Sequence, residues 1–370
     1  MRKNVYIVGF FTGFNLTAML VALPLYSIDR FRVSPFQLGI LGFFLNFLYS
    51  LNTILTGRTS LKDKRASLIK FSLFVIVFLF PSFLFLPFFP FVIALFGLYG
   101  ILQAWVWPVL QASLSSAETE SLPKVLGNYN IAWSSGNILG TSLAGKLYQI
   151  KPFLPFLVTS LISLISFLLV KGISIPPQKE GEKPFSLFHP YYLKVARLFN
   201  FFNFTILGTV IFLFPKLGRN YDFSPFLIGL LLSSIFAGRS LFFVVLRFVT
   251  FWKYKFSLLF LCPFLSILSL LLLGLMHTPS LFLVSFLLLA FSLSLTYSSS
   301  LLASIDRKMG GAITSEINES IIGAGLFSGP LVGGFISRYL SLPHTFLSFT
   351  FFVICGEIAG IYLYLKGPRR

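Results

Sequence analysis

The stretch Ser-Pro-Phe-Gln-Leu-Gly at residues 34–39 returns as Ser-Pro-Phe-Leu-Ile-Gly at residues 224–229. Each copy follows an apolar segment with a proline near its end (Pro24 and Pro215) and then a short charged stretch. We expect a helix to end at each of these prolines and a second helix to begin at each Ser-Pro pair. A repeat at a long fixed offset indicates duplicated structural units. The sequence therefore predicts two similar halves in one chain of 370 residues.

The composition of the chain excludes an ordinary soluble protein. The mean hydropathy is +0.87, and only 11% of the residues are charged, against about 25% in typical globular domains. The net charge of +18 comes from basic residues in short segments between apolar runs, which is typical of a membrane protein and not of a nucleic-acid-binding protein. Two cysteines and three scattered histidines predict neither a disulfide framework nor a metal site.

Apolar runs long enough to cross a bilayer recur along the whole chain. We predict an all-α membrane protein with twelve transmembrane helices, near residues 5–28, 35–56, 68–89, 91–115, 128–150, 153–171, 191–214, 225–247, 256–276, 280–303, 315–337 and 345–366.

The repeat and the loops divide these helices into two pseudo-symmetric six-helix bundles. We expect one bundle over residues 1–172, a polar cytoplasmic linker over 173–190, and a second bundle over 191–370. Alternating the loops between two sides places 21 Lys and Arg residues on the side of the termini and 7 on the other. The positive-inside rule then predicts both termini in the cytoplasm and the protein in the cytoplasmic (inner) membrane.

Glycines recur four residues apart in the predicted helices 128–150 and 315–337, which correspond to each other in the two halves. Small residues at this spacing let helix backbones approach closely in lipid. We interpret these residues as a helix-packing seam, at which the two halves also move against each other. The residues are Gly136, Gly140, Gly325, Gly329, Pro330 and Gly333.

Six plus six spans, a basic linker, Ser-Pro-x-x-x-Gly at residues 34 and 224, and Gly-x-x-x-Gly-Pro-x-x-Gly-Gly from Gly325 together resemble the major facilitator superfamily. The resemblance implies two bundles around a central cavity that opens alternately to either side. It also implies that helices 1, 4, 7 and 10 line the cavity and that helices 2, 5, 8 and 11 form the seam. The chain departs from the family pattern after helix 2, where Leu61 stands in place of the usual aspartate and Asp63 is the candidate gating substitute.

Polar and aromatic side chains at helical spacing predict the wall of a cavity. Interhelical hydrogen bonding is the structural alternative for the same residues. The cavity candidates are Gln103, Trp107 and Gln111 in helix 4, Asn200 and Asn203 in helix 7, and Tyr297 in helix 10.

Three ionisable residues lie within the predicted spans, where a charge is costly unless it is paired or hydrated. For Arg239 we consider a salt bridge to Glu319, capture of an anionic solute, or extension of its side chain to the membrane surface. Glu319 is a candidate for proton coupling or for stabilisation at a helix N-terminus. Glu357 is a candidate for proton binding or for a structural role.

The chain therefore predicts a secondary active transporter that moves a small solute by alternating access. Within that class, proton-coupled efflux of drug-like or metabolite compounds stands beside transport of an organic anion through Arg239. A transporter-like sensor that does not transport is the alternative from another class. We expect a monomer in the lipid bilayer with a small-molecule substrate, protons as a candidate coupling ion, no nucleic-acid partner, no cofactor and no enzymatic activity.

Overall fold

The computed structural model describes residues 2–58, 65–113, 122–170, 190–305 and 312–366, and these residues are almost entirely α-helical. The helices are α1 (Arg2–Phe31), α2 (Pro35–Arg58), α3 (Arg65–Ser82), α4 (Phe89–Ala112), α5 (Leu122–Ile150), α6 (Leu154–Leu169), α7 (Pro190–Asn220), α8 (Pro225–Phe248), α9 (Phe256–Leu275), α10 (Pro279–Ile305), α11 (Ala312–Ile336) and α12 (Leu342–Leu365).

Ten of these helices in the described part of the chain are long and apolar enough to cross a membrane. The two others are α6, which is apolar but has 16 residues, and the more polar α5. Across the twelve helices, many large apolar side chains are exposed, such as Phe78 on α3 and Phe351 on α12. In water such a surface would be unfavourable, whereas in lipid it is the expected one. The protein is a multi-pass integral membrane protein.

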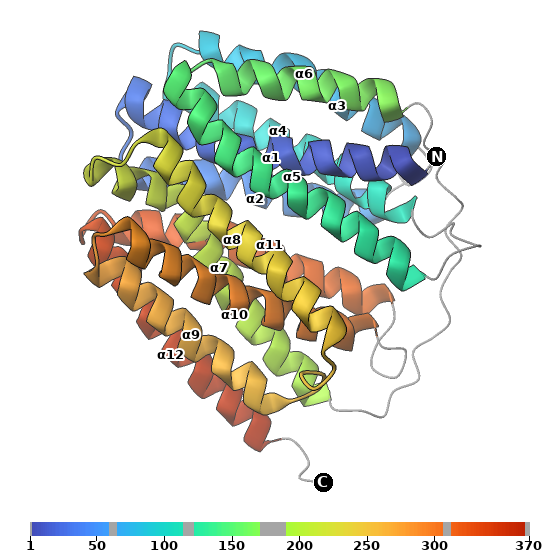
Figure 1. The fold of residues 1–370 in the computed structure, drawn as a ribbon, viewed down its shortest axis with the longest axis vertical. Coiled ribbons are helices and arrows are strands. Elements are labelled where there is room, and N and C mark those ends of the chain that lie inside the picture. The colour runs from blue at the N-terminus through green and yellow to red at the C-terminus, as the bar shows by residue number, and fades with distance from the viewer. Residues whose placement is uncertain (1, 59–64, 114–121, 171–189, 306–311, 367–370) are drawn as a thin grey trace.

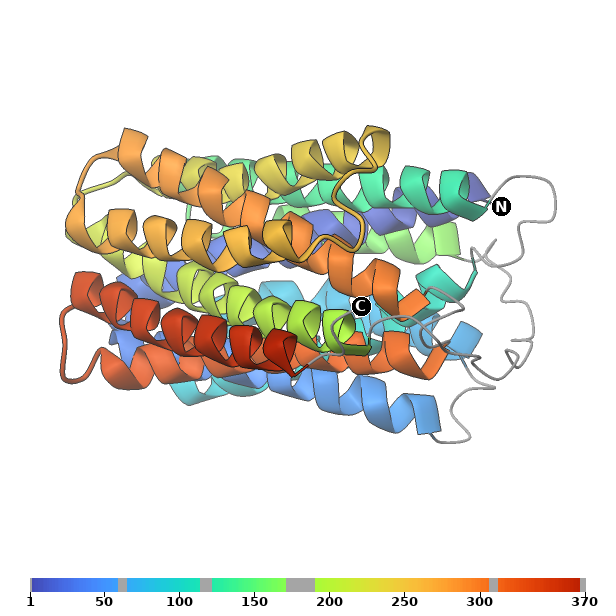
Figure 2. The same ribbon diagram turned by 90° about the horizontal axis from the view of Figure 1, so that it is seen from below.

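The twelve helices form two groups that run in nearly the same direction. Helices α1–α6 occupy the upper part of Figure 1 and α7–α12 the lower part. Figure 2 shows the helices lying along one axis, with the chain reversals α1–α2 and α7–α8 at the end opposite the N-terminus. We call the end at which α1 and α7 begin the termini side and the opposite end the far side. A buried apolar cluster that includes Leu23, Leu38 and Phe212 runs from one group into the other.

The prediction that helices end at Pro24 and Pro215 is wrong. Both prolines lie inside helices, and α1 and α7 continue beyond them to Phe31 and Asn220. A proline removes one backbone hydrogen bond, and neighbouring helices in a membrane bundle can compensate for this loss. Instead, α1 stops directly before Arg32, which has a φ of 53°, and α7 stops two residues before Asp222, which has a φ of 57°.

The repeated Ser-Pro stretch forms the N-terminal caps of α2 and α8. The Ser34 hydroxyl accepts from the Gln37 amide at 3.3 Å, and the Gln37 side-chain oxygen accepts from the Ser34 amide at 2.8 Å. In the second copy, the Ser224 hydroxyl accepts from the Leu227 amide at 3.2 Å. A side-chain cap satisfies an amide that has no partner within the helix, and proline is favoured in the first turn.

The glycines predicted to lie at the seam between the halves pack within each half instead. A Cβ at Gly136 or Gly140 would meet the carbonyl oxygen of Phe10 or Phe14 on α1. The first half therefore holds α5 against α1 by backbone contact that any side chain would prevent.

The second half repeats this arrangement between α11 and α7. A Cβ at Gly325 would lie 2.7 Å from the Phe201 carbonyl oxygen, and one at Gly329 would meet the Thr205 carbonyl oxygen. Gly333 faces the Thr209 and Leu213 side chains of the same helix α7. The interpretation of these glycines as tight packing points agrees with the structure, but their assignment to the contact between the halves needs correction.

Other glycines bring the two halves together on the far side. Gly39 of α2 lies against Gly334 of α11, where a Cβ would be 3.0 Å from the Gly334 Cα, and against the Pro330 carbonyl oxygen. Gly145 of α5 lies against Gly229 of α8, with a corresponding distance of 3.2 Å. The seam therefore consists of the helix pairs α2–α11 and α5–α8, and of the predicted residues only Pro330 takes part directly.

Candidate functional site

Arg239 is the central feature of the candidate site. It lies on α8, and only 8% of its surface is exposed. Its guanidinium carbon is 5.5 Å from the ring centre of Phe204, 5.7 Å from that of Phe243 and 6.0 Å from that of Tyr297. We call these three rings, which come from α7, α8 and α10, the arginine cage. Cation–π contacts of this kind contribute ~0.5–2 kcal/mol each.

The salt bridge between Arg239 and Glu319 is not formed. Among the described residues the guanidinium has no carboxylate partner, and its Nε atom is buried without a hydrogen-bond acceptor. Burial also contradicts extension of the side chain to the membrane surface. A charge at the middle of a membrane helix costs roughly 2.5–3.5 kcal/mol, which the cage offsets only in part. Of the three roles considered for Arg239, this geometry contradicts the salt bridge to Glu319 and the extension to the membrane surface.

Tyrosines from both halves meet beside the arginine cage. Tyr297 lies within electrostatic range of Arg239, Glu319 and Tyr49. Tyr129 of α5 lies within electrostatic range of both Tyr49 of α2 and Tyr297. We call Tyr49, Tyr129 and Tyr297 the tyrosine cluster. The site is therefore shared by the two halves of the chain.

Glu319 is the carboxylate nearest to this region among the residues named so far. Its side chain is exposed. Within the described residues it makes no ion pair. Its neighbour Asn318 is fully buried, and neither polar atom of that side chain has a partner. Glu319 is near the start of α11, which begins on the termini side.

The asparagines predicted to line a cavity form a buried network instead. The Asn203 side-chain nitrogen donates to Ser292 at 2.9 Å and to Thr296 at 3.0 Å, and its oxygen accepts from Ser266 at 2.6 Å. Asn200 donates to Ser300 at 3.1 Å. These bonds join α7 to α9 and α10, which is the structural alternative stated above. The helix period alone could not distinguish the two roles, because α7 has a buried polar face toward its neighbours as well as a face toward the other half.

The helix 4 candidates take three different positions. Gln103 is buried, and its side chain donates to the Tyr99 hydroxyl at 2.8 Å on the same helix. Trp107 is half-buried, with its ring centre 6.2 Å from that of Trp133 on α5 in an edge-on contact. The side chain of Gln111 lies outside the described residues. These residues belong to the first half of the chain, and no contact brings Gln103 or Trp107 to Arg239 in the described part.

The remaining candidates lie apart from the site. Glu357 is half-buried on α12, and it makes no ion pair with any described residue. Asp63 lies outside the described residues. Within the described part of the chain, no group of three or more His, Cys, Asp or Glu side chains could hold a metal ion.

Four aromatic residues of the site were not among the sequence candidates: Tyr49, Tyr129, Phe204 and Phe243. A signal for them exists in the sequence. Tyr49 is the residue that the repeat aligns with Arg239, and Phe243 follows Arg239 by one helical turn. The chain has 48 phenylalanines, most of which face lipid or the apolar core, so the sequence alone does not distinguish the few that lie at the site.

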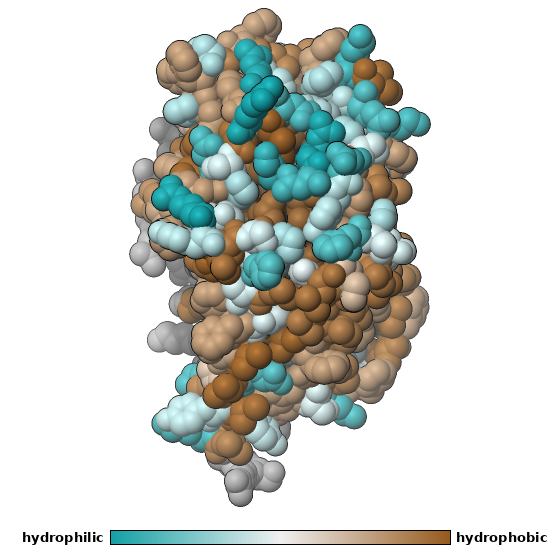
Figure 3. Space-filling view, turned by 90° about the vertical axis from the view of Figure 1, so that its left-hand side faces the viewer, coloured by the Kyte–Doolittle hydropathy of each residue, from teal (hydrophilic) through white to brown (hydrophobic). Residues whose placement is uncertain are grey.

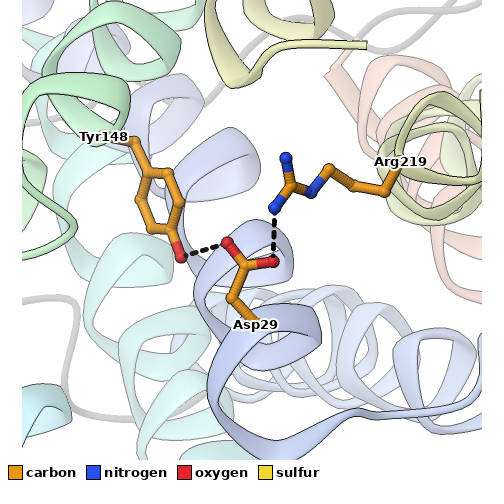
Figure 4. A network of polar contacts seen from close by, with 3 residues as sticks. All are labelled: Asp29, Tyr148 and Arg219. Atoms are coloured by element: carbon orange, nitrogen blue, oxygen red, sulfur yellow. Dashed lines mark hydrogen bonds and ion pairs between the residues drawn. The ribbon is translucent and has the colours of Figure 1, made fainter. Parts of the chain in front are cut away.

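The far side of the molecule is closed by polar contacts between the halves. The Arg219 guanidinium of α7 lies 2.9 Å from an Asp29 carboxylate oxygen of α1, and the Tyr148 hydroxyl of α5 donates to the other oxygen at 3.0 Å (Figure 4). We call these three residues the far-side latch. Figure 3 shows hydrophilic side chains gathered over this end of the molecule, between apolar flanks.

Two further contacts cross the seam at the same end. The Phe226 amide of α8 donates to the Gln149 side-chain oxygen of α5 at 3.3 Å. The guanidinium of Arg338, just after α11, lies 3.4 Å from the ring centre of Phe36 on α2. The two halves are therefore joined by polar contacts on the far side.

Two pseudo-symmetric helix groups, a site shared between them and closure on one side define a membrane transport protein. The chain belongs to the Major Facilitator Superfamily, whose family model matches residues 5–317. It is a secondary transporter, not an enzyme.

Solved structures show the same fold. A bacterial homologue of the human lysosomal transporter Spinster, in an inward-facing and occupied conformation, superimposes with a TM-score of 0.78 at 13% sequence identity over 99% of this chain and 96% of that one. The nucleoside transporter NupG gives a TM-score of 0.76 at 13% identity over 99% of both chains. No curated protein matches the sequence. At these identities the similarity shows the fold alone.

Proposed function

We propose that this protein transports an organic anion across the cytoplasmic membrane by alternating access, and that the anionic group binds Arg239. The observation that carries the proposal is a buried guanidinium with no carboxylate partner among the described residues, placed beside the tyrosine cluster between the halves. Guanidinium groups recognise carboxylates and phosphates by paired hydrogen bonds. A solute carrying such a group would neutralise the charge that the fold leaves unpaired.

The arginine cage adds a preference for solutes with an apolar or aromatic part. Phe204, Phe243 and Tyr297 cover the guanidinium with ring surface. Aromatic ligand groups gain ~0.5–1.5 kcal/mol from offset or edge-on ring contacts beyond the area they bury. Small aromatic carboxylates are therefore the first probes to use.

The far-side latch supports alternating access. We propose that in this conformation a solute reaches Arg239 from the termini side, since contacts between the halves join them on the far side. The charge bias of the loops supports a cytoplasmic position for both termini. We propose that this is the inward-facing state of a transporter that functions as a monomer, since a single chain forms both walls of the site. Reporter fusions at each terminus test the orientation.

The test replaces Arg239 by glutamine and by lysine in purified protein reconstituted in liposomes. We expect the wild type to take up labelled benzoate derivatives, Arg239→Gln to lose binding by ~10-fold or more, and Arg239→Lys to retain part of it, because the loss of one charge-assisted bond is worth ~1.5–3 kcal/mol. The control is Arg247→Gln on the same helix, whose side chain is exposed.

Equal uptake of carboxylates by the wild type and Arg239→Gln would refute the organic-anion proposal. Binding without uptake for every solute would instead support the transporter-like sensor. Thermal shift of the detergent-purified protein measures binding separately from transport, because a ligand that binds the folded state raises its melting temperature.

Proton-coupled efflux of drug-like or metabolite compounds is the second candidate, and the exposed carboxyl of Glu319 favours it. An exposed carboxyl can exchange protons with solvent. The test is solute-driven proton movement in liposomes with a pH-sensitive dye. We expect Glu319→Gln to abolish that movement if Glu319 couples transport to protons, and Glu357→Gln on the outer helix α12 to leave it unchanged.

A further inference from the structure

A pocket of about 390 Å³ lies on the far side, between the two halves of the chain. Its walls come from the start of α2 and from the residues directly after α11: Ser34, Pro35, Phe36, Gln37, Ser337 and Arg338. We propose that this pocket binds the phosphate of an anionic phospholipid headgroup, and that the bound lipid stabilises far-side closure. The pocket is separate from the site at Arg239, so the proposal does not rest on the organic-anion function.

Arg338 supplies the charge of the pocket. Its guanidinium carbon lies 3.4 Å from the ring centre of Phe36, so a ring of one half covers a face of a guanidinium from the other half. The Arg338 side chain is exposed and makes no ion pair with any described residue. A guanidinium is planar and carries its N–H donors along its edge, so the contact with Phe36 leaves those donors available. Paired N–H donors of this kind bind phosphate oxygens.

The other polar groups of the pocket lie at the start of α2. The Gln37 side chain and the Ser34 hydroxyl each cap a backbone amide there, so binding of an anion depends on Arg338 and not on the helix N-terminus alone. The exposed Ser34 hydroxyl accepts in this cap and keeps its own O–H for donation. Donors from both halves therefore face the pocket, and no acidic side chain is among its lining residues.

Exposed aromatic rings lie beside Arg338 in the chain. Phe335 is 51% exposed and Tyr339 is 75% exposed, and their ring centres are 5.6 Å apart. Tyrosine is favoured where a membrane meets water. Acyl chains of a phospholipid can pack against such rings, whereas a free phosphate ion gains nothing from them. These rings favour a membrane lipid over a soluble anion as the ligand.

The far side of the described chain also carries an excess of positive charge. The basic residues near the helix ends on this side are Arg30, Arg32, Lys146, Lys151, Lys216, Arg219 and Arg338. The acidic residues there are Asp29 and Asp222, and Asp29 is paired with Arg219. Basic clusters at a membrane surface attract anionic lipids over about a Debye length. The charge of this end therefore favours an anionic headgroup over a neutral one.

Binding at this pocket is linked to conformation, because its walls come from both halves. The start of α2 touches the end of α11 beside the pocket, where a Cβ at Gly334 would be 3.2 Å from the Phe36 Cα. Opening of the far side separates these two helix ends and removes the pocket. A ligand that binds one of two states more tightly shifts the population toward that state. The lipid therefore favours the state that is closed on the far side.

The experiment measures binding and closure on the full-length protein. Native mass spectrometry of the detergent-purified protein compares retention of phosphatidylglycerol with retention of phosphatidylcholine. Distances between spin labels at Lys151 and Asn220, after replacement of Cys262 and Cys355, report far-side closure in nanodiscs. The nanodiscs contain phosphatidylcholine alone, phosphatidylcholine with inorganic phosphate in the buffer, or an equal mixture of phosphatidylcholine and phosphatidylglycerol.

The variants are Arg338→Gln, Arg338→Lys and Phe36→Leu. The control is Lys146→Gln, which removes an exposed cation of the same side that does not line the pocket. We expect phosphatidylglycerol to raise the ratio of closed to open wild-type molecules by about 2- to 5-fold, the effect of an exposed ion pair. Arg338→Gln should lose this effect and the preferential retention of phosphatidylglycerol, whereas Lys146→Gln should keep both.

The two other variants should fall between these results. Arg338→Lys should retain part of the binding, since an ammonium group lacks the paired N–H edge. Phe36→Leu should weaken binding, because the guanidinium loses the ring that holds it.

Equal retention of phosphatidylglycerol by Arg338→Gln and Lys146→Gln would overturn the site. A shift of the same size with inorganic phosphate in phosphatidylcholine nanodiscs would overturn the lipid as its ligand. Retention without any change in the distances would overturn the link to closure. Arg239-dependent uptake in phosphatidylcholine liposomes is measured separately, so failure of the organic-anion function is distinguished from failure of this site.

Discussion

Asp29 and Arg219 are joined by an ion pair of 2.9 Å, and their separation in the sequence equals the offset between the two copies of the Ser-Pro stretch. They are therefore equivalent positions of the two halves that carry opposite charges. Equivalent positions in two pseudo-symmetric bundles can meet only near the axis that relates the bundles. The duplication thus places two equivalent positions next to each other. Because one carries Asp29 and the other Arg219, they form an ion pair between the halves on the far side.

The first prediction concerns this ion pair. Replacing Asp29 by asparagine should weaken closure of the far side, because Arg219 loses its carboxylate partner. Both side chains are 34% exposed, so the pair contributes ~0.2–1 kcal/mol, which corresponds to roughly a 1.5- to 5-fold change in the ratio of closed to open molecules. Distances between spin labels at Lys151 and Asn220, after replacement of Cys262 and Cys355, measure that ratio.

The exchanged pair Asp29→Arg with Arg219→Asp is the matched control. It should restore most of the closed population, whereas each single substitution should not. An unchanged distance distribution in Asp29→Asn would show that the glycine contacts of the seam close the far side without the ion pair.

The second prediction separates the two kinds of glycine contact. Gly145→Ala should shift molecules away from far-side closure, because its Cβ would meet the Pro225 carbonyl oxygen across the seam. Gly136→Ala should instead lower the free energy of unfolding by ~1–3 kcal/mol, because Phe10 lies in the same half in every conformation. Spin-label distances and thermal unfolding, measured on both variants, check the difference. The same effect of both substitutions on both measurements would contradict this distinction.

The third prediction assigns a structural role to Asn203. Asn203→Leu should lower stability by ~1–2 kcal/mol, since interhelical hydrogen bonds in membranes average ~0.6 kcal/mol and three are lost. The KM for transport should remain unchanged, because the side chain bonds to Ser266, Ser292 and Thr296 and not to the site. Ser142→Ala is the control, since that hydroxyl bonds only to carbonyl oxygens of its own helix. A raised KM with unchanged stability would indicate that Asn203 lines the cavity after all.

The fourth prediction tests the arginine cage. Phe243→Leu keeps an apolar side chain of similar size but removes one ring face from Arg239, so it should weaken binding of aromatic carboxylates by ~0.5–2 kcal/mol, about 2- to 30-fold. The control is Phe248→Leu, on the same helix but 78% exposed. Calorimetric titration with benzoate derivatives measures both, and equal affinities for the two variants would exclude the cage from the binding site.

Local patterns predicted the helices and their pairing into repeats. Period and hydropathy located twelve helices, and Ser34 and Ser224 correctly indicated where α2 and α8 begin. The prediction that helices end at Pro24 and Pro215 was wrong. A proline stops a helix in water more readily than in a membrane bundle, where neighbouring helices satisfy the freed carbonyl group. The candidate site was predicted in part: Arg239, Tyr297 and Glu319 were selected as costly or cavity-facing residues, whereas Tyr49 and Tyr129 were not.

The repeated Ser-Pro stretch and the apolar runs determined by themselves that this chain is a duplicated bundle of membrane helices, because these features depend on each segment and on the length that a bilayer requires. The tertiary structure decided three other features: the helix that each glycine contacts, the absence of an ion pair between Arg239 and Glu319, and the ion pair between Asp29 and Arg219. A helix has several faces with similar composition, and only the packing of all twelve helices selects the face that each polar side chain uses.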